Sequence, residues 1–245
     1  MITKEMLLEI AKKKGLTNRE HMEKDYFQDL FLFHLYKKTN LLIFKGGTCL
    51  YKIYGLPRFS EDLDFSVLGE TDTEKLVNEV ADKIGAEVKN AKRTKNSLLI
   101  RLGFKGILTS YNSLRIDISL KNEVFGYDVK NYVPPYIDLN PFSLKVLNLK
   151  EMLAEKIHSI LARDSARDLY DLFFLTRFVE PDKEIIEKKL GLFGMKFDYK
   201  EFQKRINGLK SVWEAELKPF VLAELPGFEV AKDFVLEKIS RIKKV

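Results

Sequence analysis

The sequence predicts an α+β fold, a small mixed sheet with helices followed by an all-helical part. Short apolar or alternating runs that suit strands lie in the first 140 residues, such as LLIF at 41–44 and SLLIRLGF at 97–104. From about residue 145 onward, Phe and Leu recur at helical spacing. Between these parts, YVPPYIDLNPF holds three of the seven prolines. We therefore expect an α/β domain over residues 1–140 and a helical domain over 141–245.

The expected elements of the α/β domain follow from caps, glycines and alternation. Helices are expected from Thr3 to about Gly15, from the capping-box segment TNRE at 17–20, after the glycines at 46–47, and from TDTE at 71–74 to about Ile84. Strands are expected at 41–44, 62–67, about 86–93, 97–104 and 113–120.

Composition excludes several functional classes. The 45% hydrophobic and 32% charged residues describe a folded globular protein. No apolar run approaches the roughly 20 residues of a membrane span, and the first 14 residues are amphipathic rather than signal-like, so a cytoplasmic location is expected. The single Cys49 and three scattered histidines argue against disulfides and a zinc hydrolase. A net charge of +6 is compatible with a nucleic-acid partner without indicating one.

Three aspartates in strand-like surroundings form a candidate metal site. In the alternating run DLDFSV, Asp62 and Asp64 point to one face of the expected strand. Two adjacent carboxylates repel each other unless a cation neutralises them, and Mg²⁺, with Mn²⁺ as the alternative, prefers oxygen ligands. Asp117, between two isoleucines, joins this pair if its strand lies beside DLDFSV. The alternative is a simple ion pair of Asp117 with Arg115.

A glycine turn precedes the aspartates. Gly46 and Gly47 separate an expected strand from an expected helix, so their backbone amides at the helix N-terminus can face an anion, and Thr48 adds a hydroxyl. The spacing is not that of a Walker A loop. Taken alone, the glycines can equally form only a tight turn between a strand and a helix.

A second charged block lies in the helical part. Lys156, Arg163 and Arg167 share roughly one face if their helix is continuous, and such a cationic stripe suits triphosphate oxygens. Asp168 and Asp171 are one helical turn apart, and Asp171 can hold Lys156 or an arginine in position. The alternative is a pair of surface helices laced with weak salt bridges.

Together these motifs resemble the DNA polymerase β-like nucleotidyltransferase superfamily, with its apolar strand, glycine pair, Asp-x-Asp and later lone Asp. The segment RFSEDLD at 58–64 narrows the resemblance to the AbiEii/AbiGii toxin family, which includes the MenT toxins and carries a G-G-T…R-x-S-x-D-x-D signature. The segments EMLAEKI at 151–157 and RDLYDL at 167–172 are similar to that family's second-half motifs. The resemblance spans roughly residues 40–180.

The resemblance implies a metal-dependent nucleotidyltransferase that uses an NTP. It implies nucleotide contacts from a set of six residues and a catalytic set of five. The nucleotide set is Gly46, Gly47, Thr48, Arg58, Ser60 and Lys156, although Arg58 and Ser60 can equally brace the aspartate strand. The catalytic set is Asp62, Asp64, Asp117, Lys156 and Asp171. MenT-type relatives act on tRNA ends, and the family implies a toxin with an antitoxin partner. The alternatives are transfer to a protein or a small molecule, and a non-catalytic nucleotide- or RNA-binding module.

Overall fold

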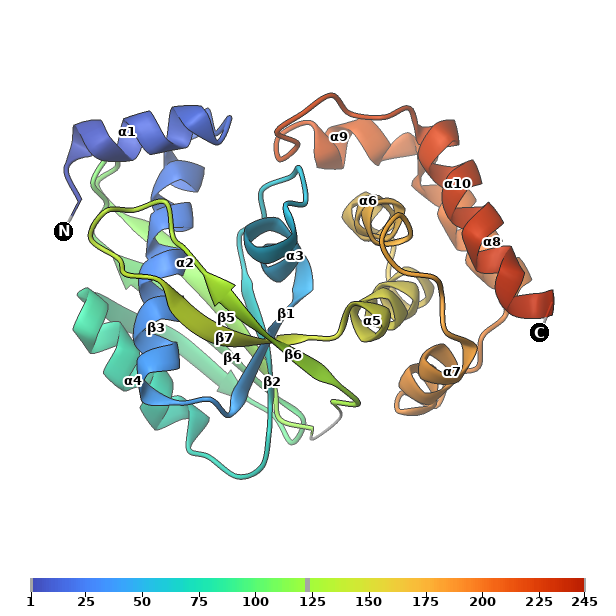
Figure 1. The fold of residues 1–245 in the computed structure, drawn as a ribbon, viewed down its shortest axis with the longest axis horizontal. Helices are drawn as coiled ribbons and strands as arrows, with labels where there is room; N and C mark the ends of the chain where they lie inside the picture. The colour runs from blue at the N-terminus through green and yellow to red at the C-terminus, as the bar shows by residue number, and fades with distance from the viewer. Residues whose placement is uncertain (1, 122–123, 245) are drawn as a thin grey trace. The chain divides into compact units, whose positions relative to one another are not determined.

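The computed structural model describes residues 2–121 and 124–244, which form ten α-helices, two short 3-10 helices and one seven-stranded sheet (Figure 1). These elements divide into two compact units. A sheet unit runs to Gly55 and resumes over Phe59–Val146, and a helical unit comprises Leu56–Arg58 and the chain from Leu147 onward. The division differs from the expected boundary after residue 140, because the strand that follows pairs within the sheet.

The sheet is mixed, as its connections require. Its strands are β1 (Leu42–Lys45), β2 (Leu63–Val67), β3 (Ala86–Arg93), β4 (Ser97–Phe104), β5 (Asn112–Ser119), β6 (Tyr127–Tyr132) and β7 (Phe142–Leu147), in the order β3-β4-β5-β2-β1-β7-β6. The pairs β2–β5 and β1–β7 are parallel, whereas β1–β2, β3–β4 and β4–β5 are antiparallel. Strands β6 and β7 were not expected from the sequence, since one is polar and the other follows a proline.

Helices of the sheet unit cover the apolar face of the sheet. The four helices are α1 (Lys4–Lys13), α2 (Arg19–Lys38), α3 (Gly46–Tyr54) and α4 (Thr73–Ile84). Helices α2 and α4 pack on each other, and Phe27 of α2 stacks on Phe104 of β4 with 3.7 Å between ring centroids. The caps lie one residue later than the first residue of each expected capping segment: Asn18 caps α2 and Asp72 caps α4.

The helical unit is a bundle around α5. Its helices are α5 (Leu149–Ala162), α6 (Ala166–Leu175), α7 (Lys183–Gly191), α8 (Tyr199–Gly208), α9 (Trp213–Leu217) and α10 (Phe228–Ser240), with 3-10 turns at Leu209–Ser211 and Arg241–Lys244. Helix α5 packs against α6, α7 and α8, while α10 packs against α6 and α8. Within residues 2–121 and 124–244, no helix is long and apolar enough to cross a membrane.

A buried ion cluster joins α3 to α2 inside the sheet unit. The Lys52 side chain is fully buried, and its Nζ lies 2.9 Å from Asp25 Oδ1 and 2.8 Å from Asp29 Oδ1. Lys14 Nζ lies 2.5 Å from Asp25 Oδ2. Tyr132 donates its hydroxyl hydrogen to Asp29, at 3.0 Å from Oδ2. Two lysines therefore neutralise two buried aspartates, which is the arrangement that makes buried carboxylates tolerable.

The two aspartates of this cluster differ in acidity. Burial alone would raise the pKa of Asp25, but Lys52 and Lys14 more than offset it and hold that pKa below its usual value. Burial raises the pKa of Asp29, and the charge of Asp25 adds to this effect. Lys52 is therefore the cation on which the ionised state of the cluster depends.

Replacing Lys52 by Met is expected to destabilise the protein by about 3–5 kcal/mol, because Asp25 and Asp29 would remain buried with one fewer cation. Urea unfolding followed by circular dichroism measures this loss. Lys75→Met on the exposed surface of α4 is the control and should leave the midpoint unchanged. The double variant Lys52→Met/Asp29→Asn should recover part of the loss; equal instability of single and double variants would contradict the charge-balance explanation.

Candidate functional site

The turn between β1 and α3 requires a glycine at position 46 on two counts. Gly46 has φ +74°, and a Cβ added there would lie 2.1 Å from Asp64 Oδ2 and 2.8 Å from its Cγ. The carboxylate of Asp64 therefore lies directly against the backbone at the N-terminus of α3. The helix dipole and the amides of its first turn favour negative charge at this position.

Sheet register brings Asp64 and Asp117 together. Strands β2 and β5 are parallel neighbours in which Asp64 is the direct partner of Asp117, so both side chains project from the same face. On the other side of β2, Lys45 is the partner of Asp64. The expected adjacency of the two strands is confirmed, although nothing in the sequence fixed it.

Arg115 links Asp117 to Asp62. Its Nη2 lies 3.2 Å from Asp117 Oδ2 and its Nη1 lies 3.8 Å from Asp62 Oδ2. All three side chains are partly exposed, Arg115 by 44%. Asp117 thus lies beside Asp64 and also pairs with Arg115, so the two arrangements weighed from the sequence occur together. Proximity of Arg115 to Asp62 had no signal in the sequence.

These carboxylates would suit a magnesium ion that substrate oxygens and waters also hold, and they do not form a complete protein cage. Among the residues that the structure describes, no three Asp, Glu, His or Cys side chains converge as a metal site. Mg²⁺ is commonly held by one or two carboxylates together with substrate phosphates and waters. The pair Asp64 and Asp117 offers such oxygen ligands, and Asp62, which lies near Arg115, stays a predicted third ligand.

Thr48 and Gln28 hold the segment that leads to the aspartates. Thr48 is fully buried, and its hydroxyl donates to the backbone carbonyl of Asp62. Gln28 of α2 donates from Nε2 to the carbonyl of Ser60, at 2.8 Å, and to that of Glu61, at 3.0 Å. Both contacts involve the backbone before β2. They give Thr48 and Gln28 a positioning role, while phosphate contacts from Thr48 and Ser60 stay predictions from the sequence.

Arg58 and Asp171 form a buried bidentate ion pair within the helical unit. Arg58 is 3% exposed, and its Nε and Nη2 each donate to one oxygen of Asp171, at 2.7 Å. Lys156 Nζ lies 2.8 Å from Asp171 Oδ2 and 2.9 Å from Asp168 Oδ1. Asp171 therefore contacts both Lys156 and an arginine, and these pairs are buried rather than spread over a surface.

The expected stripe of Lys156, Arg163 and Arg167 is wrong, because the helix is not continuous. Helix α5 ends at Ala162, and Arg163 is its C-cap in extended conformation. Arg163 Nε turns to Asp168 at 2.9 Å, while Arg167 lies over the ring of Phe220. The residue types Asp164-Ser165, which favour helix starts, were the missed signal.

The acidity of Asp168 reflects its partners. Burial alone would raise the pKa of Asp168, but Lys156 and Arg163 more than offset burial and lower that pKa to about 2. Asp168 is therefore a permanent anion near neutral pH. Its charge holds Lys156 and Arg163 in place and is not available as a proton acceptor under those conditions.

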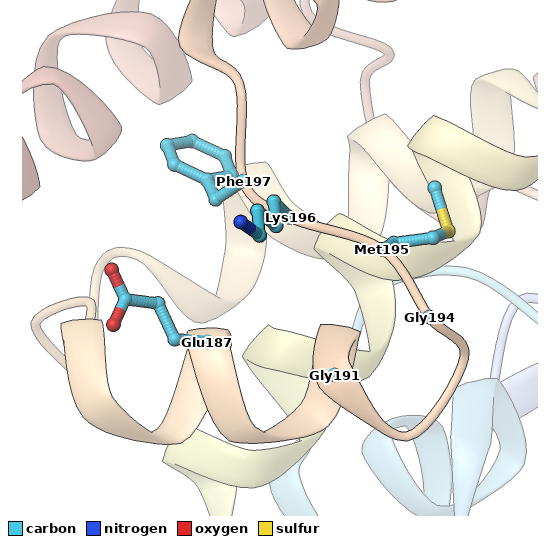
Figure 2. A pocket seen from close by; sticks show the side chains of 6 residues that line it. All are labelled: Glu187, Gly191, Gly194, Met195, Lys196 and Phe197. Atoms are coloured by element: carbon cyan, nitrogen blue, oxygen red, sulfur yellow. The ribbon is translucent and has the colours of Figure 1, made fainter.

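Two other features lie outside the predicted site. A hollow of about 620 Å³ in the helical unit lies between α7 and the segment that follows it, lined by Glu187, Gly191, Gly194, Met195, Lys196 and Phe197 (Figure 2). None of the predicted site residues lines this hollow. Cys49 is buried, and burial raises the pKa of its thiol well above the usual value, which makes it unsuited to be a nucleophile.

Comparison with solved structures shows the same fold. MenT4, a nucleotidyltransferase toxin from Mycobacterium tuberculosis H37Rv, superposes with a TM-score of 0.66 at 18% identity, covering 96% of this chain and 89% of that one. JHP933 from Helicobacter pylori superposes with a TM-score of 0.58 at 21% identity, covering 91% of this chain and 93% of that one. A candidate nucleotidyltransferase from H. pylori superposes with a TM-score of 0.61 at 20% identity, covering 93% of this chain and 96% of that one.

No curated protein matches the sequence. A family model does, that of the nucleotidyl transferase AbiEii toxins of type IV toxin–antitoxin systems, over residues 30–236. This range includes the glycine turn, the three aspartates of the sheet unit and the Arg58–Asp171–Lys156 group. The chain belongs to the AbiEii nucleotidyltransferase toxin family.

Proposed function

We propose that the protein transfers a nucleotide from an NTP to the 3′ hydroxyl of a tRNA, with attack on the α-phosphate and release of pyrophosphate, with Mg²⁺ or Mn²⁺, as the toxin of a cytoplasmic toxin–antitoxin pair. The observation that carries the proposal is the register of Asp64 and Asp117 beside Gly46. The family supports an NTP substrate and an antitoxin partner. The net charge of +6 is compatible with an RNA acceptor.

The glycine turn serves the triphosphate in this proposal. The first amides of α3, at Gly46 and Gly47, have no partner within their own helix and are suited to phosphate oxygens. The N-cap residue Lys45 makes no side-chain capping hydrogen bond. Thr48 has a positioning role, because its buried hydroxyl donates to the backbone carbonyl of Asp62 and so fixes the segment that enters β2.

Asp64 and Asp117 would hold the metal ion, which when bound neutralises phosphate charge. Asp117 also orients the acceptor hydroxyl and accepts its proton, since it is partly exposed and lies in the same row as Asp64. Arg115 pairs with Asp117 and Asp62 and so aligns the two carboxylates. Chemistry of this kind depends mainly on positioning and on charge stabilisation, which these side chains supply.

Arg58 and Asp171 act as positioning residues in this proposal. The bidentate pair fixes Leu56–Arg58, which lies directly before the Ser60–Asp62 segment in the chain. Lys156 uses two of its three N–H donors on Asp168 and Asp171. Contact of Lys156 with nucleotide phosphate stays a prediction from the sequence.

Incubation with each labelled NTP, Mg²⁺ and total tRNA tests the transfer. Wild-type protein should label RNA, and Asp64→Asn should lower the rate roughly 100- to 1,000-fold, because a charged group at the reaction centre is lost. Asp82→Asn, an exposed acid on α4, is the matched control. Label on protein, or no label on RNA with any NTP, would contradict the proposed acceptor. Normal growth of cells that express the wild-type protein would contradict the toxin role.

Gly46→Ala should abolish transfer, whereas Gly55→Ala should not. Both positions have φ +74°, so each alanine carries strain of about 1–2 kcal/mol. Only at position 46 would the new Cβ collide with Asp64, since nothing lies within 4 Å at position 55. Urea unfolding and kcat are measured for both variants. Equal activity of the two would show that the close approach to Asp64 has no functional role.

Arg58→Lys should destabilise the protein by about 2 kcal/mol, because a lysine cannot replace both charge-assisted hydrogen bonds to Asp171. Arg205→Lys is the control, since Arg205 forms an exposed pair with Glu201 one helical turn away. The urea midpoint is the measurement for both. An unchanged midpoint for Arg58→Lys would mean that the bidentate geometry contributes nothing.

A further inference from the structure

The face of the sheet that carries Asp117 continues outward across β4 and β3. Asp117 on β5 is the partner of Leu99 on β4, which in turn is the partner of Lys92 on β3. Because direct partners project from the same face and adjacent strands lie about 4.8 Å apart, Lys92 lies about 10 Å from Asp117 along this row. Lys92 is exposed at the sheet edge.

A second row places two arginines opposite each other. Arg115 and Arg101 are direct partners on antiparallel β5 and β4. Like charges in this relation destabilise a sheet. Asp62 and Asp117 offset the charge of Arg115, but among the described residues no carboxylate lies within ion-pair distance of the exposed Arg101. The structure thus keeps an unfavourable pair of cations next to the candidate site.

An exposed aromatic ring lies beyond the arginines. A Cβ added at Gly103 would lie 1.8 Å from the Tyr111 hydroxyl and 2.9 Å from Lys89 Cε, so both side chains lie over this glycine. Tyr111 is 49% exposed. Lys89 Nζ lies 5.5 Å from the centre of its ring and also pairs with Glu87. The ring therefore remains accessible for stacking.

The opposite face of these strands is closed to ligands. Leu98, Ile100 and Ile116 alternate with the residues above and are fully buried. Helix α2 packs on β5 and helix α4 packs on β3 (Figure 1). The cations and the aromatic ring thus share the face that the sheet unit's own helices leave open.

We propose that this open surface, the β3–β5 face defined by Lys89, Lys92, Arg101, Tyr111 and Arg115, binds the single-stranded RNA end that accepts the nucleotide. The inference rests on the proposed transfer to RNA. Lys92, Arg101 and Arg115 project from the same face across β3, β4 and β5, a span of about 10 Å that suits a phosphate backbone, and an exposed ring accepts a base of any sequence. Arg115 then lies at the end of this surface nearest the candidate site, where the terminal 3′ hydroxyl of the RNA would lie beside Asp117.

The test measures RNA binding without NTP or metal. Fluorescence anisotropy of a labelled single strand of about 12 nucleotides, within the range covered by such platforms, gives the affinity as a function of salt. Arg101→Gln/Lys92→Gln should bind about tenfold more weakly at low salt, and the log–log salt slope should fall in magnitude by about 1.4, or 0.7 per lost phosphate contact.

Matched controls separate the face from overall charge. Lys75→Gln/Lys83→Gln removes the same charge from exposed positions on α4, on the other side of the sheet, and should leave affinity and slope unchanged. Tyr111→Leu should weaken binding about tenfold through loss of base stacking, whereas Tyr127→Leu, an exposed tyrosine on β6, should not. Equal effects of the test and control variants, or no effect of either, would overturn the inference.

Kinetics separate this inference from the proposed function. If RNA is labelled, Arg101→Gln/Lys92→Gln should raise the KM for RNA about tenfold and leave the KM for NTP unchanged. If RNA is labelled but the KM for RNA is unchanged in this variant, the proposal that the β3–β5 face binds RNA is wrong, while the proposed transfer stands. Label only on protein, with RNA binding still dependent on Arg101 and Lys92, would overturn the proposed acceptor but support an RNA-binding face.

Discussion

The close approach of the Asp64 carboxylate to the backbone of Gly46 is the constraint on which the candidate site depends. Strand β1 passes into α3 without an intervening loop, and a left-handed glycine makes the change of direction. The absent Cβ leaves the room in which Asp64 lies. The Asp64 carboxylate therefore lies beside the N-terminus of α3 and on a strand of the parallel pair β2–β5. Any side chain at position 46 would occupy the space of this carboxylate.

The sequence predicts local structure well where side-chain alternation is strong. The expected strands at 86–93 and 97–104 have the observed bounds, because apolar and polar residues alternate along them or glycine and turn residues delimit them. Strand β6, YDVKNY, is too polar to stand out, and β7 follows a proline. The break after Ala162 decides between the continuous helix and the pair of helices, which the sequence left open.

Contacts between segments that are distant in the chain cannot be predicted from this sequence alone. Asp62-x-Asp64 and Asp117 are recognisable as strand aspartates, but only the order of the sheet makes Asp64 and Asp117 neighbours. Lys52 reads as an ordinary surface lysine of a short helix, yet it lies fully buried between two aspartates. Buried charges appear in sequence as solvated ones, because their partners come from other elements.

Arg58 shows a consequence of such a contact for the chain as a whole. Three residues, Leu56–Arg58, belong to the helical unit although the chain before and after them belongs to the sheet unit. The backbone of Pro57 accepts a hydrogen bond from Leu222, 3.0 Å away, and the guanidinium of Arg58 is enclosed by its pair with Asp171. A fragment ending near residue 146 would retain this arginine without its carboxylate. A fragment that begins at residue 147 would in turn keep Asp171 without Arg58, so a single cut in the chain cannot separate the two units cleanly.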